Sequence, residues 1–142
     1  MTGKTAESLE AEIAVLEANT AFYRAFSQGD LAAMSALWAA RAPSACLHPG
    51  MAALVGRRAI LSSWEEILRE MGGTEMECRN PRVHLLGDVA FVLCLEAGAD
   101  QPAHLAATNI FVREGANWRM VHHHAGPLSR PVRKAAPERT SN

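Results

Sequence analysis

Three histidines carry the chemistry that the sequence suggests most directly: His48, His122 and His124. An imidazole has a pKa of about 6.5, so near neutral pH it can accept a proton, donate to an oxyanion or bind a metal ion. His122 and His124 occupy alternate positions of a predicted strand and should project in one direction. We predict these three as catalytic acid–base residues. The plainer alternative is that they complete the sheet through hydrogen bonds. A three-histidine metal site is a weaker alternative, and we predict none because no carboxylate stands at a familiar metal-motif spacing.

Alternation along the strand at 118–124 decides which imidazole enters the interior. It divides the side chains into two sets: Trp118, Met120, His122 and His124 on one face, and Arg119, Val121 and His123 on the other. A β-bulge in this strand would shift the register and turn His123 inward instead.

Five further residues are predicted to contact a ligand: Tyr23, Trp38, Trp64, Asn109 and His123. The two tryptophans lie on apolar stripes of predicted helices, so packing in the core is the alternative for them. The hydroxyl of Tyr23 needs a partner if it is buried. Asn109 interrupts an apolar strand, where its amide must be hydrogen-bonded and could orient a ligand.

Three amphipathic helices are predicted in the first half of the chain. Apolar residues recur at helical spacing from Glu7 to Ser27, from Leu31 to about Ala40 and from Arg57 to Met71. Gly29 suits the end of the first helix, and Asp30 suits the N-cap of the second. Two helices joined so tightly should pack against a common layer.

Four strands are predicted to follow, at 74–86, 89–96, 104–113 and 118–124. Pro81 indicates an edge strand or a bulge. The second strand is nearly all apolar, which predicts cover on both faces. Helices followed by an antiparallel meander are typical of an α+β fold. Because a long meander twists, we expect a cone-like half-barrel with the three N-terminal helices packed in the concave face of a curved, mainly antiparallel sheet.

Composition favours one soluble globular domain in 142 residues, with 49% apolar and 20% charged residues. We predict a flexible N-terminus at 1–6, the domain at 7–127 and a flexible tail at 128–142. A net charge of −1 gives no basic field, so neither nucleic acid nor a membrane is an expected partner. Three widely spaced cysteines suit buried thiols in a reducing cytoplasm.

Several strings, in their order along the chain, resemble the nuclear transport factor 2-like superfamily, and in particular its SnoaL-like and calcium/calmodulin-dependent kinase association-domain-like branches. The matching strings are Phe22-Tyr23-Arg24-Ala25-Phe26, Gly29-Asp30-Leu31, Leu37-Trp38, His48-Pro49-Gly50, Gly56-Arg57-Arg58-Ala59-Ile60, Ser63-Trp64 and Trp118-Arg119-Met120-Val121-His122-His123-His124. Together they span residues 8 to 127.

The resemblance implies a homodimer built through the sheet and a pocket inside the cone, with no cofactor. We expect a domain that binds a small, mainly apolar or carbonyl-bearing molecule. One alternative is an isomerase, cyclase or dehydratase that uses a pocket histidine as general acid and base. Another is a dimerisation or assembly module. The chain departs from the isomerase pattern, because Tyr23 is its one tyrosine and Asp88 and Asp100 fall in predicted turns.

Overall fold

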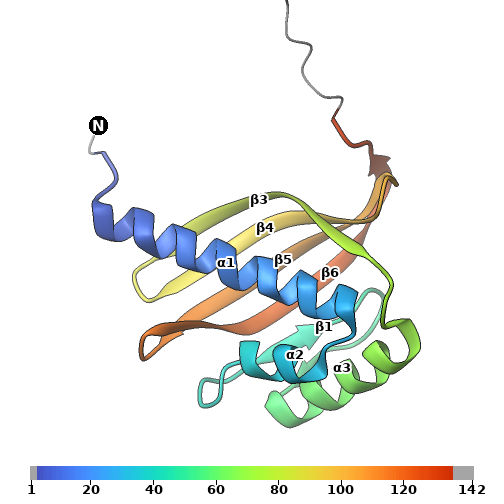
Figure 1. The fold of residues 1–142 in the computed structure, drawn as a ribbon, viewed down its shortest axis with the longest axis horizontal. Coiled ribbons are helices and arrows are strands. Elements are labelled where there is room, and N and C mark those ends of the chain that lie inside the picture. Colours follow the sequence, from blue (N-terminus) through green and yellow to red (C-terminus); the bar gives the residue numbers. More distant parts are fainter. Residues whose placement is uncertain (1–2, 136–142) are drawn as a thin grey trace, which may run out of the picture.

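The computed structural model describes residues 3–135, as three helices and a six-stranded sheet (Figure 1). The helices are α1 (Ala6–Gln28), α2 (Leu31–Leu37) and α3 (Arg57–Met71). The strands are β1 (Ala45–Leu47), β2 (Leu54–Val55), β3 (Met76–Leu86), β4 (Val89–Gly98), β5 (Ala103–Glu114) and β6 (Asn117–Val132). Their order in the sheet is β2-β1-β6-β5-β4-β3, with all neighbours antiparallel except the pair β1 and β6. The predicted α+β cone fold is confirmed.

The helix ends follow the capping residues of the sequence. Thr5 caps α1 by accepting a hydrogen bond from the backbone N–H of Ser8, and Asp30 caps α2 in the same way through Ala33. Gly29 between the two helices has the left-handed conformation that glycine adopts without strain, with φ of 64°. None of the helices in the described part of the chain has the length and apolarity needed to span a membrane.

α2 ends at Leu37, earlier than the predicted Ala40, because Trp38 turns to extended backbone and Ala39 donates to the carbonyl of Met120 on β6. Arg57 at the start of α3 reinforces this corner. Its guanidinium donates to the carbonyl oxygens of Trp38 at 2.7 Å and Ser35 at 2.9 Å. A cation that opposes the dipole of its own helix thus satisfies the free carbonyls at the end of another.

α1 crosses the strands on one face of the sheet and packs mainly on β3, as Figure 1 shows. The core between them is closed by large side chains with less than 2% of their surface exposed, among them Phe22, Met34, Trp38, Ile60 and Phe111. Along β4 only one face is fully buried in this chain. Phe91, Leu93 and Leu95 on the opposite face are half-buried, so the predicted cover on both faces is not found within a single chain.

β3 is an edge strand with an irregularity, as Pro81 predicts. Its pairing with β4 shifts between Arg79 and Arg82, and Asn80 has a positive φ of 53°. Such a break, with a proline that has no N–H to donate, makes the free edge a poor template for another strand.

A bulge in β6 corrects the predicted face assignment. Ile110 pairs with His122, whereas the next residue, Phe111, pairs with Met120, so Val121 is left over. His123 and Ala125 therefore continue the buried face of Trp118 and Met120. The prediction that His122 and His124 share that face is wrong.

β6 also runs further than predicted. Its residue Val132 pairs with Ala103, so the predicted domain boundary at 127 falls inside a strand, and part of the predicted tail at 128–142 is strand. Residues 1–2 and 136–142, which belong to the two predicted flexible ends, lie outside the described residues.

The close approach of Gly29 to Gly72 gives a first prediction. A Cβ at Gly29 would lie 3.0 Å from the Cα of Gly72, whereas a Cβ at Gly87, which has nearly the same φ of 65°, would meet open space. Both Gly→Ala changes strain a left-handed backbone by about 1–2 kcal/mol. Gly29→Ala must in addition displace backbone, so it should lower the free energy of unfolding clearly more than Gly87→Ala.

Urea unfolding of the two variants and the wild type measures this difference directly. Equal losses in the two variants would show that Gly72 leaves room for a Cβ at Gly29, which would contradict the prediction.

Candidate functional site

A cavity of about 190 Å³ lies inside the cone, between α1, α3 and the sheet. Its wall is mostly apolar, from Phe26, Pro49, Trp64, Ile67, Met71, Met76 and Leu105, and four polar side chains enter it: Tyr23, His48, Glu96 and His123. Larger hollows exist but are more open to solvent. One lies on the outer face of the sheet and another between α1 and β3. This less open cavity is the place where titratable groups converge.

Glu96 is the functional candidate that sequence reasoning missed. It lies on the inward face of β4 with Ala90, Val92 and Cys94 and is only 5% exposed. The hydroxyl of Tyr23 donates a hydrogen bond of 2.7 Å to its Oε2. Burial raises the pKa of the carboxyl above its ordinary value. The available signal was a lone carboxylate that ends an otherwise apolar strand.

His123 faces Glu96 across the cavity. Its Nε2 lies 3.8 Å from Glu96 Oε2. Burial, with smaller contributions from His48, His122 and His124, lowers the pKa of His123 to about 3. Burial thus weakens the charged form of both partners: it raises the pKa of Glu96 and lowers that of His123, so a salt bridge is disfavoured although the two groups are close.

A buried amide network holds these groups in place. Asn109 Oδ1 accepts from His123 Nδ1 at 2.6 Å, and Asn109 Nδ2 donates to Asn19 Oδ1 at 2.8 Å and to Tyr23 Oη at 3.1 Å. Asn19 then donates to the thiol of Cys78 at 3.4 Å. Because burial raises the pKa of Tyr23 far above its ordinary value, this residue stays a hydroxyl donor. The sequence pointed to Asn109 and Tyr23 but not to Asn19.

Two cysteine thiols lie beside this network. The hydroxyl of Tyr23 is 3.2 Å from the sulfur of Cys94. The neighbouring thiol of Cys78, followed by burial, raises the pKa of Cys94, and the interaction with Cys94 lowers the pKa of Cys78. Cys94 is therefore an inert thiol that packs against Tyr23.

His48 enters the cavity from the segment that follows β1. Its Nε2 lies 2.8 Å from Ser63 Oγ on α3, and its ring packs edge-on against Trp64 at 4.9 Å between centroids. Burial lowers the pKa of His48, so its neutral form is favoured. Trp64 also lies 6.0 Å from the ring of His123, which makes this tryptophan the apolar wall between the two histidines.

The predicted site residues divide into three groups by position. Tyr23, His48, Trp64 and His123 meet at the cavity, and Asn109 lies directly behind them. Trp38 is 1% exposed in the core and does not line the cavity.

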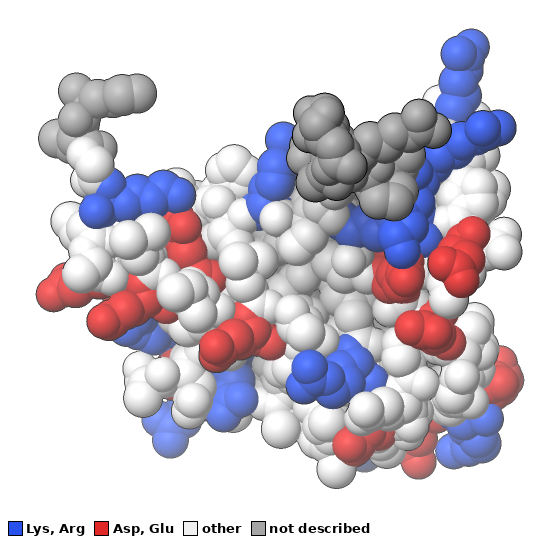
Figure 2. All heavy atoms as spheres, turned by 45° about the horizontal axis from the view of Figure 1, so that its top comes forward, with Lys and Arg blue, Asp and Glu red and all other residues white. Residues whose placement is uncertain are grey.

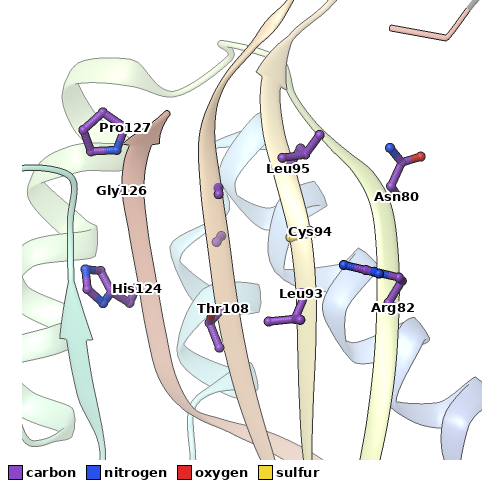
Figure 3. Close-up of a pocket in the computed structure, with 11 residues that line it drawn as sticks. Asn80, Arg82, Leu93, Cys94, Leu95, Thr108, His124, Gly126 and Pro127 are labelled. Carbon is purple, nitrogen blue, oxygen red and sulfur yellow. The ribbon is translucent and has the colours of Figure 1, made fainter. Parts of the chain in front are cut away.

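His122 and His124 lie on the outer face of the sheet, with ring centroids 6.2 Å apart. His124 lines the shallow hollow there with Arg82, Leu93 and Thr108, as Figure 3 shows. The role predicted for these two histidines inside the cone therefore has no geometric support. Among the described residues no group of three or more histidine, cysteine, aspartate or glutamate side chains is arranged to hold a metal ion.

Two solved structures share this architecture, and one curated protein is similar in sequence. A Streptomyces avermitilis protein of the NTF2-like family, provisionally assigned as a dehydratase, is 31% identical, with a TM-score of 0.73 over 82% of this chain and 95% of that chain. A Thiobacillus denitrificans protein provisionally assigned as a calcium/calmodulin-dependent protein kinase type II association domain is 34% identical, with a TM-score of 0.70 over 79% of this chain and 93% of that chain. F-box protein SKIP8 of Arabidopsis thaliana is 26% identical over 115 residues, which are 81% of this chain and 50% of that protein.

The chain thus spans about half the length of the curated relative it matches. The profile of the SnoaL-like domain matches residues 15–129, which include every polar residue of the cavity. The chain belongs to the SnoaL-like domain family of the nuclear transport factor 2-like superfamily.

Proposed function

We propose that the cone binds a small, mainly apolar molecule and that Glu96 and His123 move a proton on it. The observation that carries this proposal is the pair itself: a carboxyl with a raised pKa lies 3.8 Å from an imidazole with a lowered pKa, in a cavity that is otherwise mostly apolar. Titratable groups whose environments shift their proton affinities are typical of acid–base sites.

The raised pKa of Glu96 and the lowered pKa of His123 suit one catalytic cycle. Protonated Glu96 can donate to a leaving or polarised oxygen, while neutral His123 accepts a proton from the same molecule at Nε2. The proton then returns from His123 to Glu96 through a hydroxyl group or water that contacts both, because 3.8 Å is too long for direct transfer. Tyr23 positions Glu96 through its hydrogen bond and so fixes the direction from which the acid acts.

The size of the cavity limits the ligand. Pockets for drug-sized molecules occupy about 300–1,000 Å³, so a space of about 190 Å³ suits a smaller molecule. Its aromatic and aliphatic wall favours an apolar body with a polar group directed at Glu96 and His123. The likeness to a provisionally assigned dehydratase supports acid–base chemistry on a molecule that carries a hydroxyl or carbonyl group.

The charges on the surface support a small-molecule ligand in preference to nucleic acid. In Figure 2 acidic side chains gather over α1, and basic ones gather near the end of the described chain. The basic group includes the exposed residues Arg130, Arg133 and Lys134. Neither sign forms a continuous field over the face shown, which therefore offers no basic track for a polyanion. The free cysteines Cys46, Cys78 and Cys94 fit a reducing compartment such as the cytoplasm.

A homodimer through the sheet is a second part of the proposal. The half-buried residues Phe91, Leu93 and Leu95 of β4 lie beside Ala106 and Ile110 of β5. Together these side chains form an apolar patch on the outer face of the sheet. A second copy packed there would bury the side of β4 that one chain leaves half-exposed.

The acid–base role predicts a large loss of proton transfer in Glu96→Gln. The probe is 3-hydroxycyclohexanone in D₂O, and proton NMR measures exchange beside its carbonyl together with loss of water. The wild type should accelerate exchange over buffer, and Glu96→Gln should reduce that acceleration by about 10²-fold or more. Glu65→Gln, an exposed change on α3, is the matched control. Full activity in Glu96→Gln would remove Glu96 from the mechanism.

The lowered pKa of His123 predicts a stability that depends on pH. A group whose pKa is lower in the folded chain binds fewer protons there than in the unfolded chain. The contribution of His123 to the free energy of unfolding is therefore lost as pH falls from the ordinary pKa of a histidine towards about 3. The raised pKa of Glu96 contributes in the opposite direction in both the wild type and His123→Asn, so the test is the difference between these two proteins: the urea midpoint of the wild type should fall relative to that of His123→Asn as pH decreases over this range. His84→Asn, a change at an exposed histidine of β3, should leave the profile as in the wild type. Parallel profiles in all three proteins would contradict a buried neutral His123.

The proposed dimer predicts that Leu93→Arg is monomeric. An arginine at this position would place an unpaired charge in an apolar interface, whereas Val55→Arg, on a residue that is 75% exposed, should not change the assembly. Native mass spectrometry of untagged protein distinguishes the two states and also detects any copurified small molecule. A monomeric wild type would refute the dimer.

A further inference from the structure

We infer that the cavity selects hydroxyl-bearing molecules, because Asn109 and Ser63 fix the tautomers of His123 and His48 so that each ring presents a lone pair to the ligand. The inference rests on the proposed function and adds the substrate class and two positioning residues. It follows from the number of protons that each group in the network has to give.

Asn109 decides the tautomer of His123. The two hydrogens of its Nδ2 are directed at Asn19 Oδ1 and Tyr23 Oη, so the atom that faces His123 Nδ1 at 2.6 Å is the carbonyl oxygen Oδ1. An amide oxygen only accepts hydrogen bonds, which places the proton of His123 on Nδ1. A neutral imidazole carries one such proton, so Nε2 holds the lone pair.

The free Nε2 of His123 needs a donor. Its distance of 3.8 Å from Glu96 Oε2 is beyond hydrogen-bond range, so these two atoms do not bond each other. An oxygen atom of a ligand in the cavity, beside the two atoms and about 2.8 Å from each, would bridge them. A hydroxyl can donate to Nε2 and accept from protonated Glu96 at once. A ketone oxygen can only accept, and it would face the lone pair of Nε2.

Ser63 sets the tautomer of His48 by the same reasoning. The hydroxyl of Ser63 donates its single proton to the carbonyl of Ile60 at 3.0 Å, so its oxygen accepts from His48 Nε2–H at 2.8 Å. The lone pair of His48 is then on Nδ1, for which the described residues record no hydrogen-bond partner. The cavity thus combines two imidazole acceptors with one carboxylic acid donor.

This pattern distinguishes classes of small molecule. Neutral alcohols, diols and hydroxy ketones satisfy both acceptors and the acid. Hydrocarbons and simple ketones leave the acceptors unpaired, which costs affinity because buried polar groups lose their water. An anion would face the lone pairs of the two imidazoles where it needs hydrogen-bond donors, so anions should bind most weakly.

The first test reads the tautomers directly. Long-range ¹H–¹⁵N NMR of the wild type should show His123 protonated at Nδ1 and His48 at Nε2. Asn109→Asp keeps an acceptor for Nδ1–H and should keep the His123 tautomer, whereas Asn109→Leu should lose it. A wild-type His123 that is protonated at Nε2 would overturn the inference.

The second test measures selectivity with a matched pair, cyclohexanol and cyclohexanone, by NMR titration. The wild type should bind cyclohexanol about tenfold more tightly, the difference expected for one hydrogen bond to a buried acceptor. Ser63→Ala, a milder change on α3, frees the His48 tautomer and should reduce this preference with little effect on the ketone. The Ser63→Ala variant keeps the inference testable if the Asn109→Leu variant does not fold.

The outcomes separate the two proposals. Equal affinities for the alcohol and the ketone would overturn the inference and leave the acid–base proposal standing. Failure of both molecules to shift any cavity resonance at their solubility limit would contradict the proposed function itself, and the inference with it.

Discussion

Burial of the Glu96 carboxyl is the constraint on which the rest of the site depends. A carboxyl taken out of water costs free energy unless it stays protonated or gains strong hydrogen bonds. Here burial favours the protonated form, and the hydroxyl of Tyr23 supplies a short hydrogen bond. Tyr23 must then be oriented, and Asn109 does so by donating to its oxygen. The burial of Glu96 therefore explains why Tyr23 and Asn109 are placed and hydrogen-bonded as they are.

The same network links elements that are distant in sequence. Asn19 and Tyr23 lie on α1, Glu96 on β4, Asn109 on β5 and His123 on β6. Because both hydrogens of the Asn109 amide have a defined acceptor, shifting one element would leave a buried donor without a partner. The network thus specifies how α1 lies across the sheet, where apolar packing alone would tolerate small displacements.

The helices and strands could be predicted because each depends on local spacing. The boundaries of α3 followed from apolar periodicity, and the turn from α1 to α2 followed from Gly29 and Asp30. The candidate site was harder, because alternation along β6 is broken by the bulge at Val121, and a single extra residue reverses every side chain beyond it. Glu96 was missed because a carboxylate at the end of an apolar run looks like the start of a turn. Only the fold shows that its neighbours Ala90, Val92 and Cys94 bury the same face.

The contact between Gly29 and Gly72 has a consequence for the cavity as well as for the helices. Gly72 follows Met71 directly, and Met71 and Met76 form one end of the cavity wall. Two backbones that touch without side chains hold this end close to Tyr23 and Phe26. A side chain at either glycine would push the end of α3 away from the end of α1, and would therefore move two walls of the cavity apart.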